Sequence, residues 1–165
     1  HNAPPEPSPS SQKKSRAHAC RKHTNNRETV LVVAPAERTD AFIARLREKG
    51  ADVEGFRRKT MLQLSEGMED PRKQAAFISK VAASCDGRFR LLGDMMWARN
   101  KGWPPEALRD LEEMVPPSRA AEGQFFLCQY PLNSLSGQET MMALESHNHT
   151  IFRGVMRESP YFRPS

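Results

Sequence analysis

Three short, largely apolar runs constrain the fold of this chain more than any other feature of its sequence. They are Thr29–Ala34, Arg88–Gly93 and Phe125–Tyr130. The first is β-branched and uninterrupted, and Pro35 ends it. Short continuous apolar runs bounded by Gly or Pro are typical of strands that are covered on both faces, as in a parallel sheet. The sequence therefore predicts a buried sheet built from these runs.

Segments with helical spacing separate the predicted strands. A further strand is predicted within Arg57–Leu64, and a last short one at Thr150–Phe152. The predicted helices are Glu37–Lys49, Asp70–Ala82, Pro104–Val115 and Ser136–Ser146. Strands that alternate with helices of about ten to fifteen residues are typical of an α/β fold. We expect a mostly parallel sheet with helices on both faces.

Polar and aromatic side chains gather where the predicted strands end. Asp94 and Trp97 follow the second apolar run, Cys128 and Tyr130 lie in the third, and His147 follows the last helix. In open parallel sheets, ligands bind beyond the carboxyl ends of the strands. We therefore predict a ligand-binding site at this rim, made by these five residues.

Each of these residues also has an explanation that involves no ligand. A Cys in mid-strand usually packs as a small hydrophobe, which makes Cys128 a poor candidate for a catalytic nucleophile with His147 as its base. His147 could end its helix by bonding to backbone carbonyls, and Asp94 could cap the turn after its strand. His147 and His149 stand two residues apart and so do not share a helix face, and we expect no metal and no cofactor.

Several classes of protein are disfavoured by what the sequence lacks. It has no Walker A loop, no Gly-x-Gly-x-x-Gly fingerprint, no nucleophile elbow and no His-Glu-x-x-His pair. Cys20, Cys85 and Cys128 are far apart, which argues against both a disulfide framework and a structural zinc site and favours a reducing, cytoplasmic location. No apolar run approaches the roughly 20 residues that span a bilayer.

The basic charge of the chain is concentrated at its start. The sequence has 25 Lys and Arg and 20 Asp and Glu, but residues 1–28 alone carry six basic and two acidic side chains. Residues 1–17 are rich in Pro and Ser, so we expect a disordered basic tail or linker. The remaining chain is nearly neutral, which weakens a nucleic-acid-binding function for the folded part. We expect any nucleic-acid contact to come from regions outside the folded domain.

The order and spacing of four stretches resemble the MEDS domain, the sensory domain named for methanogens, methylotrophs and the dichloromethane regulator DcmR. The stretches are Arg90–Ala98, Leu127–Tyr130, Ala143–His147 and Ser159–Phe162. The resemblance implies a RecA-like three-layer α/β sandwich without a working P-loop. It also implies a sensory module that binds a small organic ligand and is attached to DNA-binding, histidine kinase or other signalling regions. The family positions carry over as Asp94, Trp97, Cys128, Tyr130 and His147.

The chain departs from the family pattern in three places. Asp94 stands where the family usually has Glu, and Asn148 stands where it has Pro. His18–Cys20 resembles the opening strand of the family, but too few residues separate it from Thr29 for the rest of that strand and its helix. Either this element is deleted, or the chain skips a segment near Cys20 and Arg21. We expect residues 18–165 to form a single MEDS-like domain.

Three functions follow as hypotheses. The first is a non-enzymatic sensory domain of a bacterial or archaeal signalling or transcription-regulatory protein, with a homodimer or signalling-partner interface and no membrane contact. The second is an interaction or scaffold module with a vestigial nucleotide-type site. The third is an enzyme, either a degenerate nucleotide hydrolase or a Cys-dependent one. We favour the first.

Overall fold

The computed structural model describes residues 27–85, 87–115 and 123–163. The predicted tail, the predicted opening strand at His18 and the segment near Cys20 and Arg21 lie outside these residues. The elements, in chain order, are β1 (Glu28–Val33), α2 (Ala36–Glu48), α3 (Val53–Arg58), β2 (Leu62–Ser65), α4 (Pro71–Ala83), β3 (Arg88–Asp94), α5 (Met96–Asn100), α6 (Pro105–Met114), β4 (Gln124–Gln129), the short 3-10 helix η2 (Leu132–Ser134), α7 (Gly137–Ser146), β5 (His149–Phe152) and β6 (Val155–Glu158).

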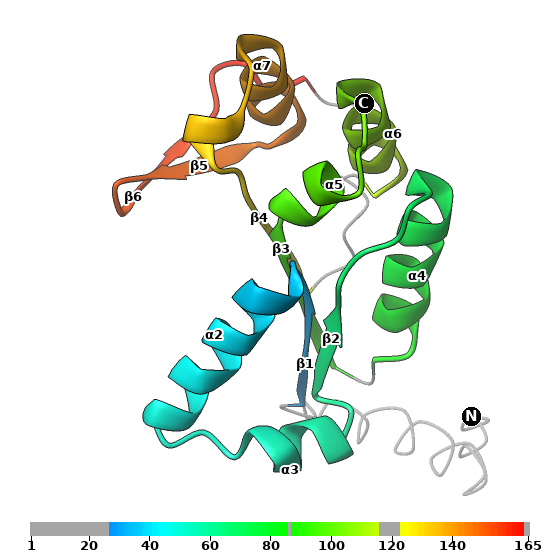
Figure 1. Ribbon diagram of the computed structural model, residues 1–165, viewed down its shortest axis with the longest axis vertical. Coiled ribbons are helices and arrows are strands. Elements are labelled where there is room, and N and C mark those ends of the chain that lie inside the picture. Colours follow the sequence, from blue (N-terminus) through cyan, green and yellow to red (C-terminus); the bar gives the residue numbers. More distant parts are fainter. Residues whose placement is uncertain (1–26, 86, 116–122, 164–165) are drawn as a thin grey trace, which may run out of the picture.

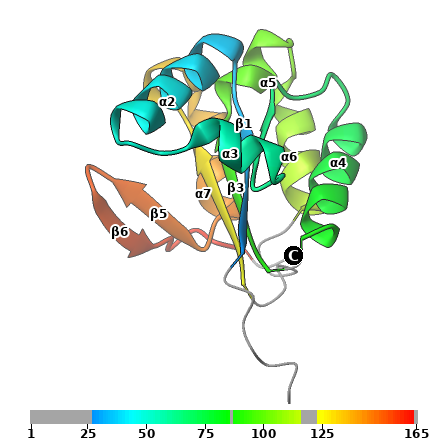
Figure 2. The same cartoon turned by 90° about the horizontal axis from the view of Figure 1, so that it is seen from below.

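A four-stranded sheet with the order β2-β1-β3-β4 forms the centre of the fold. All three strand pairs are parallel. In Figure 1 the sheet lies between α2 and α3 on one face and α4 and α6 on the other, and Figure 2 shows the same layers from below. The predicted α/β fold, with a parallel sheet flanked by helices on both faces, is confirmed.

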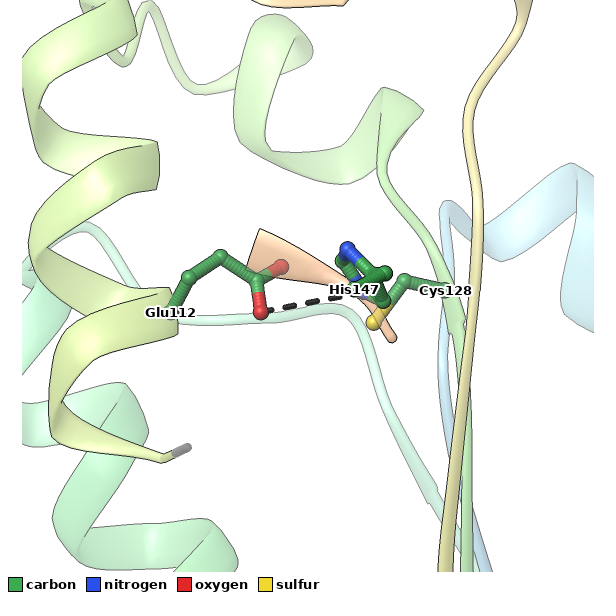
Figure 3. Close-up of side chains that lie close together, drawn as sticks. All are labelled: Glu112, Cys128 and His147. Carbon is green, nitrogen blue, oxygen red and sulfur yellow. Dashed lines mark ion pairs between the residues drawn. The ribbon is translucent and has the colours of Figure 1, made fainter. Parts of the chain in front are cut away.

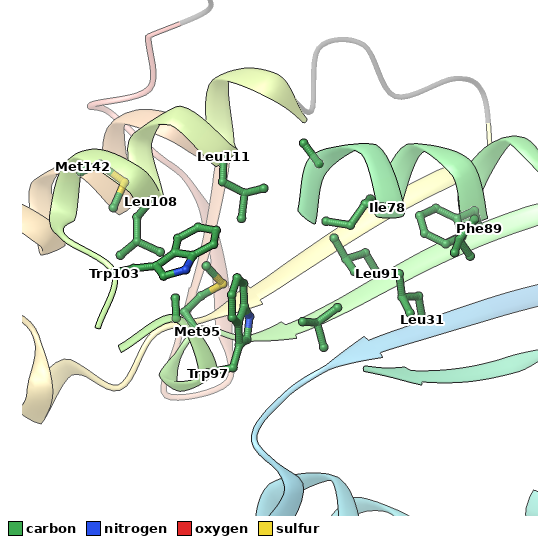
Figure 4. Close-up of a cluster of buried hydrophobic side chains, with 14 residues drawn as sticks. Leu31, Ile78, Phe89, Leu91, Met95, Trp97, Trp103, Leu108, Leu111 and Met142 are labelled. Carbon is green, nitrogen blue, oxygen red and sulfur yellow. The ribbon is translucent and has the colours of Figure 1, made fainter. Parts of the chain in front are cut away.

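The sheet divides the core into two clusters. Alternate residues of β1 and β3, such as Leu31, Phe89 and Leu91, pack against Ile78 of α4 and Leu111 of α6 (Figure 4). The cluster on the opposite face is smaller, and it joins β1 and β2 to α2 and α3. The outward face of β4 is not covered by this smaller cluster, and Phe125 and Leu127 on it are exposed.

The second strand begins later than the sequence predicts. We expect a strand within Arg57–Leu64, but Val53–Arg58 forms α3, and β2 covers only Leu62–Ser65. The Asp52 carboxylate accepts a hydrogen bond from the Gly55 backbone N–H at 2.9 Å and so caps α3. A helix of six residues is too short to show a clear helical period, which is why its sequence does not reveal it.

One further α-helix and one further strand are missing from the sequence prediction. The short helix α5 turns the chain directly after β3, and β6 follows β5. β5 does not join the main sheet but pairs with β6 in a separate antiparallel hairpin. The two residues of its tight turn, Arg153 and Gly154, have positive φ angles of 50° and 77°. A pair of positive φ angles suits a two-residue turn between antiparallel strands.

Hydrogen bonds hold both ends of α7. Ser136 and Glu139 form a reciprocal capping box at its start. At its other end, the Ser159 hydroxyl donates to the Leu144 carbonyl at 2.7 Å, and the Arg163 backbone N–H donates to the Glu145 carbonyl at 2.9 Å. The segment after the hairpin therefore fixes the last turn of α7, and with it His147, the C-cap residue.

Candidate functional site

A small cavity lies on the face of the sheet that α4 and α6 cover. Its floor is the row Val33, Gly93 and Cys128, which are paired across β1, β3 and β4 near the carboxyl ends of these strands. Ile78, Leu91, Leu111, Val115 and Phe126 line it with apolar surface. The cavity has a volume of about 30 Å³. It lies near the rim at which the sequence predicts a site.

One wall of the cavity is polar. Glu112 of α6, Cys128 of β4 and His147 after α7 all line it, and Figure 3 shows their side chains converging. The Tyr130 hydroxyl donates a hydrogen bond of 2.7 Å to Oε1 of Glu112, and Nε2 of His147 lies 3.8 Å from its Oε2. The Tyr130 and His147 rings meet edge to face, with centroids 5.8 Å apart.

The surroundings fix the protonation of three of these groups. Nδ1 of His147 lies 2.8 Å from the Ala143 carbonyl oxygen. Because a carbonyl only accepts, Nδ1 carries a proton, and the lone pair of a neutral ring is then on Nε2. Burial, reinforced by the Glu112 charge, raises the pKa of the Cys128 thiol and of the Tyr130 phenol well above their usual values. Cys128 is therefore a thiol at neutral pH.

A buried amide lines another part of the cavity. Gln74 of α4 is fully buried, and its Oε1 accepts a hydrogen bond of 3.0 Å from the Met68 backbone N–H. Its Nε2 has no hydrogen-bond partner among the described residues. A buried donor without a partner costs roughly 1–3 kcal/mol. Gln74 therefore places an unsatisfied polar group next to the cavity.

Trp97 lines the cavity from the side of α5. It is 2% exposed and packs edge to face on Trp103, with ring centroids 4.8 Å apart (Figure 4). A Cβ atom added to Gly67 would lie 2.1 Å from the Trp97 ring, so the indole rests directly on backbone. Its position is therefore set by close packing from two sides.

Asp94 is separated from the other four predicted residues. Its side chain does not line the cavity. One carboxylate oxygen accepts a hydrogen bond of 2.9 Å from Nε of Arg38 on α2, and the other accepts one of 3.1 Å from the Met96 backbone N–H. The hydrogen bond and the charge of Asp94 raise the pKa of Arg38. The structure thus brings Trp97, Cys128, Tyr130 and His147 together and gives Asp94 a structural contact between β3 and α2.

Comparison with family models gives one match, to the MEthanogen/methylotroph, DcmR Sensory domain, over residues 14–148. The chain belongs to the MEDS family. Neither the comparison with curated proteins nor that with solved structures found a match. The match ends directly after His147, so it includes every residue around the cavity but not the β5–β6 hairpin.

Two polar residues of this MEDS domain are absent from the sequence prediction. Glu112 lies four residues after Leu108 and one after Leu111 on the inward face of α6, and Gln74 lies four residues before Ile78 on α4. Both occupy positions where helical spacing calls for an apolar side chain. A polar residue in register with a buried stripe is the signal that could have identified them.

Glu112, Cys128 and His147 could also hold a metal ion, because their candidate ligand atoms all lie within 4.8 Å of one another. The expectation of no metal considers only ligands that stand close to His147 in the sequence. Here the acid comes from α6, 35 positions before His147.

Among the described residues, no helix is long and apolar enough to cross a membrane.

Proposed function

We propose that this MEDS domain is a non-enzymatic sensor that binds a small organic ligand in the cavity between the sheet, α4 and α6. The observation that supports it most strongly is a mainly apolar cavity whose few polar groups, Glu112, Cys128, His147 and Gln74, converge on it. Small-molecule sites have this composition.

The size of the cavity limits the ligand. A cavity needs roughly 10–15 Å³ to hold one water molecule, and this one has about 30 Å³. A ligand that enters without displacing the walls therefore has only a few non-hydrogen atoms. Met95 lines the cavity, and its unbranched thioether side chain adapts readily to a new neighbour. A somewhat larger ligand would be accommodated by movement of this side chain.

The chemistry of Cys128 supports a sensor rather than a Cys-dependent enzyme. The thiolate is the nucleophile in such enzymes, and burial together with the Glu112 charge keeps Cys128 protonated. A RecA-like fold without a working P-loop is also part of this proposal. The parallel sheet supports the fold, and the lack of a Walker A motif supports the missing P-loop. The cytoplasmic location stays a prediction.

A sensor needs a partner to which it passes its signal. In this proposal the partner surface is the β5–β6 hairpin, because Ile151, Phe152, Val155 and Met156 are each more than half exposed. Contiguous exposed apolar surface is typical of interaction sites. The hairpin leads into the segment that fixes the end of α7 and His147, so it is joined to the cavity wall. The partner is either a second copy of the chain or another signalling protein.

The test of the cavity is Gly93→Ala. The new methyl group would meet the Met95 and Cys128 sulfur atoms at 3.5 and 3.8 Å, which are ordinary contacts, so the fold is retained while the cavity floor is filled. Thermal unfolding is measured with a panel of short-chain alcohols, amines, carboxylates and haloalkanes. A ligand at a hundred times its Kd stabilises wild type by about 2.7 kcal/mol, and we expect Gly93→Ala to lose this effect.

Gly137→Ala is the matched control, because its methyl group would enter open space at the start of α7. It should respond to each compound as wild type does. A compound that stabilises wild type and Gly93→Ala equally binds elsewhere and contradicts the cavity assignment. If no compound in the panel stabilises wild type, the small-ligand proposal fails and the scaffold hypothesis replaces it.

A further inference from the structure

The three side chains on the polar wall, Glu112, Cys128 and His147, are of the types that zinc prefers as ligands. Zinc in proteins is bound by Cys sulfur, His nitrogen and carboxylate oxygen, and sites with three protein ligands keep a fourth position open. Cys128, His147 and Glu112 supply one ligand of each kind from three different elements. This mixture of a thiol and an imidazole does not suit magnesium or calcium, which select oxygen ligands.

The distances are close to those of a bound site. Ligand bonds of about 2.0–2.3 Å place the ligand atoms of a tetrahedral zinc site roughly 3.3–3.7 Å apart. Here the three candidate atoms lie within 4.8 Å of one another, and Nε2 of His147 is 3.8 Å from Oε2 of Glu112. Side-chain rotations that move the ligand atoms by about 1 Å would therefore bring all three to a common ion.

The neighbours of the two non-sulfur ligands already orient them as zinc requires. The Ala143 carbonyl holds the Nδ1 proton of His147 and leaves Nε2 as the ligand nitrogen. The Tyr130 hydroxyl holds Oε1 of Glu112 and leaves Oε2 on the side of His147. Metal-binding His and carboxylate groups are commonly fixed by such outer hydrogen bonds. Among the described residues, Glu112 has no ion pair with Lys or Arg, although it is 8% exposed.

From this geometry we propose that Glu112, Cys128 and His147 bind one zinc ion, with its fourth coordination position directed into the cavity. All three residues line the cavity, so this position is open to water or to a small donor molecule. The ion would balance the buried carboxylate and take the place of the thiol proton, which leaves to solvent. This inference is independent of the identity of any organic ligand.

Zinc binding is measured on the full chain under reducing conditions, by competition with a chromophoric chelator and by metal analysis after gel filtration. Every protein carries Cys20→Ser, because His18, Cys20 and His23 form a second cluster of potential ligands in the sequence. We expect one zinc ion per chain. Glu112→Gln, Cys128→Ser and His147→Gln should each weaken binding by about tenfold or more, and Tyr130→Phe by about tenfold.

Cys85→Ser is the matched control, because Cys85 is the other free thiol among the described residues and bonds to the Val81 carbonyl away from the cavity. It should bind zinc as its parent does. The parent protein, which carries only Cys20→Ser, is also loaded with cobalt. Its spectrum gives a readout that does not depend on whether a variant folds. A thiolate-to-cobalt charge-transfer band and the intense visible bands of tetrahedral cobalt are expected. Absence of zinc binding by the parent, a cobalt spectrum without sulfur, or equal affinity in all variants would overturn the proposal.

Discussion

Gly67 sits directly beneath the indole of Trp97, and its backbone has a φ of 78°. Gly67→Ala therefore adds a methyl group that clashes with the ring and also forces a non-glycine residue into a left-handed conformation. We expect this substitution to lower the free energy of unfolding by about 2–4 kcal/mol, measured by urea denaturation.

Gly50→Ala separates the two effects at Gly67. Gly50 has a φ of 82° but nothing within 4 Å of the new methyl group, so it reports the backbone cost alone, about 1 kcal/mol. If both substitutions cost the same, Trp97 is not held by contact with Gly67.

Single residues also show how far sequence reasoning reaches at this site. The sequence predicts Trp97, Cys128, Tyr130 and His147 because polar and aromatic side chains stand where predicted strands and the last helix end. Its position along the chain groups Asp94 with them, but its side chain leaves the opposite face of β3, toward Arg38. The sequence does not predict Glu112 as a site residue, because its partners lie just after β4 and after α7, and only the tertiary packing of α6 brings them together.

At the scale of elements, α7 depends on its capping box. The Ser136 backbone N–H and hydroxyl hydrogen bonds lower the pKa of Glu139, and Arg99 contributes to the same shift. A lowered pKa means that this stabilisation is complete above the usual Glu pKa of about 4.3 and is lost as pH falls through the folded-state value.

Glu139→Gln should therefore unfold more easily than wild type at pH 7, by about 1 kcal/mol. The difference should shrink and vanish in acid, as measured by urea denaturation across pH. A difference that stays constant from neutral to acidic pH would show that the charge of Glu139 plays no part.

The sequence predicts well those elements that are long enough to show a helical period or that begin at a clear capping residue. α4 begins where Asp70 accepts a hydrogen bond from the Lys73 backbone N–H, and α7 begins at its capping box, as their sequences indicate. The elements it does not predict, α3, α5 and β6, are four to six residues long. Tertiary contacts decide such short segments, because too few residues are present for a period to emerge.

At the scale of the whole molecule, the β5–β6 hairpin carries the two most exposed large apolar side chains among the described residues, Met156 and Phe152. Phe152→Ser combined with Met156→Ser should leave the thermal unfolding midpoint nearly unchanged, because both side chains are more than half exposed. If the partner is a second copy, wild type sediments as a dimer at high concentration and the double variant as a monomer. A monomeric wild type would exclude the second copy and leave a different signalling protein as the partner.

β4 is the last strand of the sheet and pairs only with β3 among the described residues, and its outward face is exposed. Cys128 thus belongs to an edge strand, whereas Gly93 beside it belongs to a strand paired on both sides. Local opening of a sheet costs least at such a margin. The part of the cavity floor that β4 forms should therefore open more readily than the part that β3 forms. Opening of β4 alone would let a small molecule reach Cys128 while the other three strands stay paired.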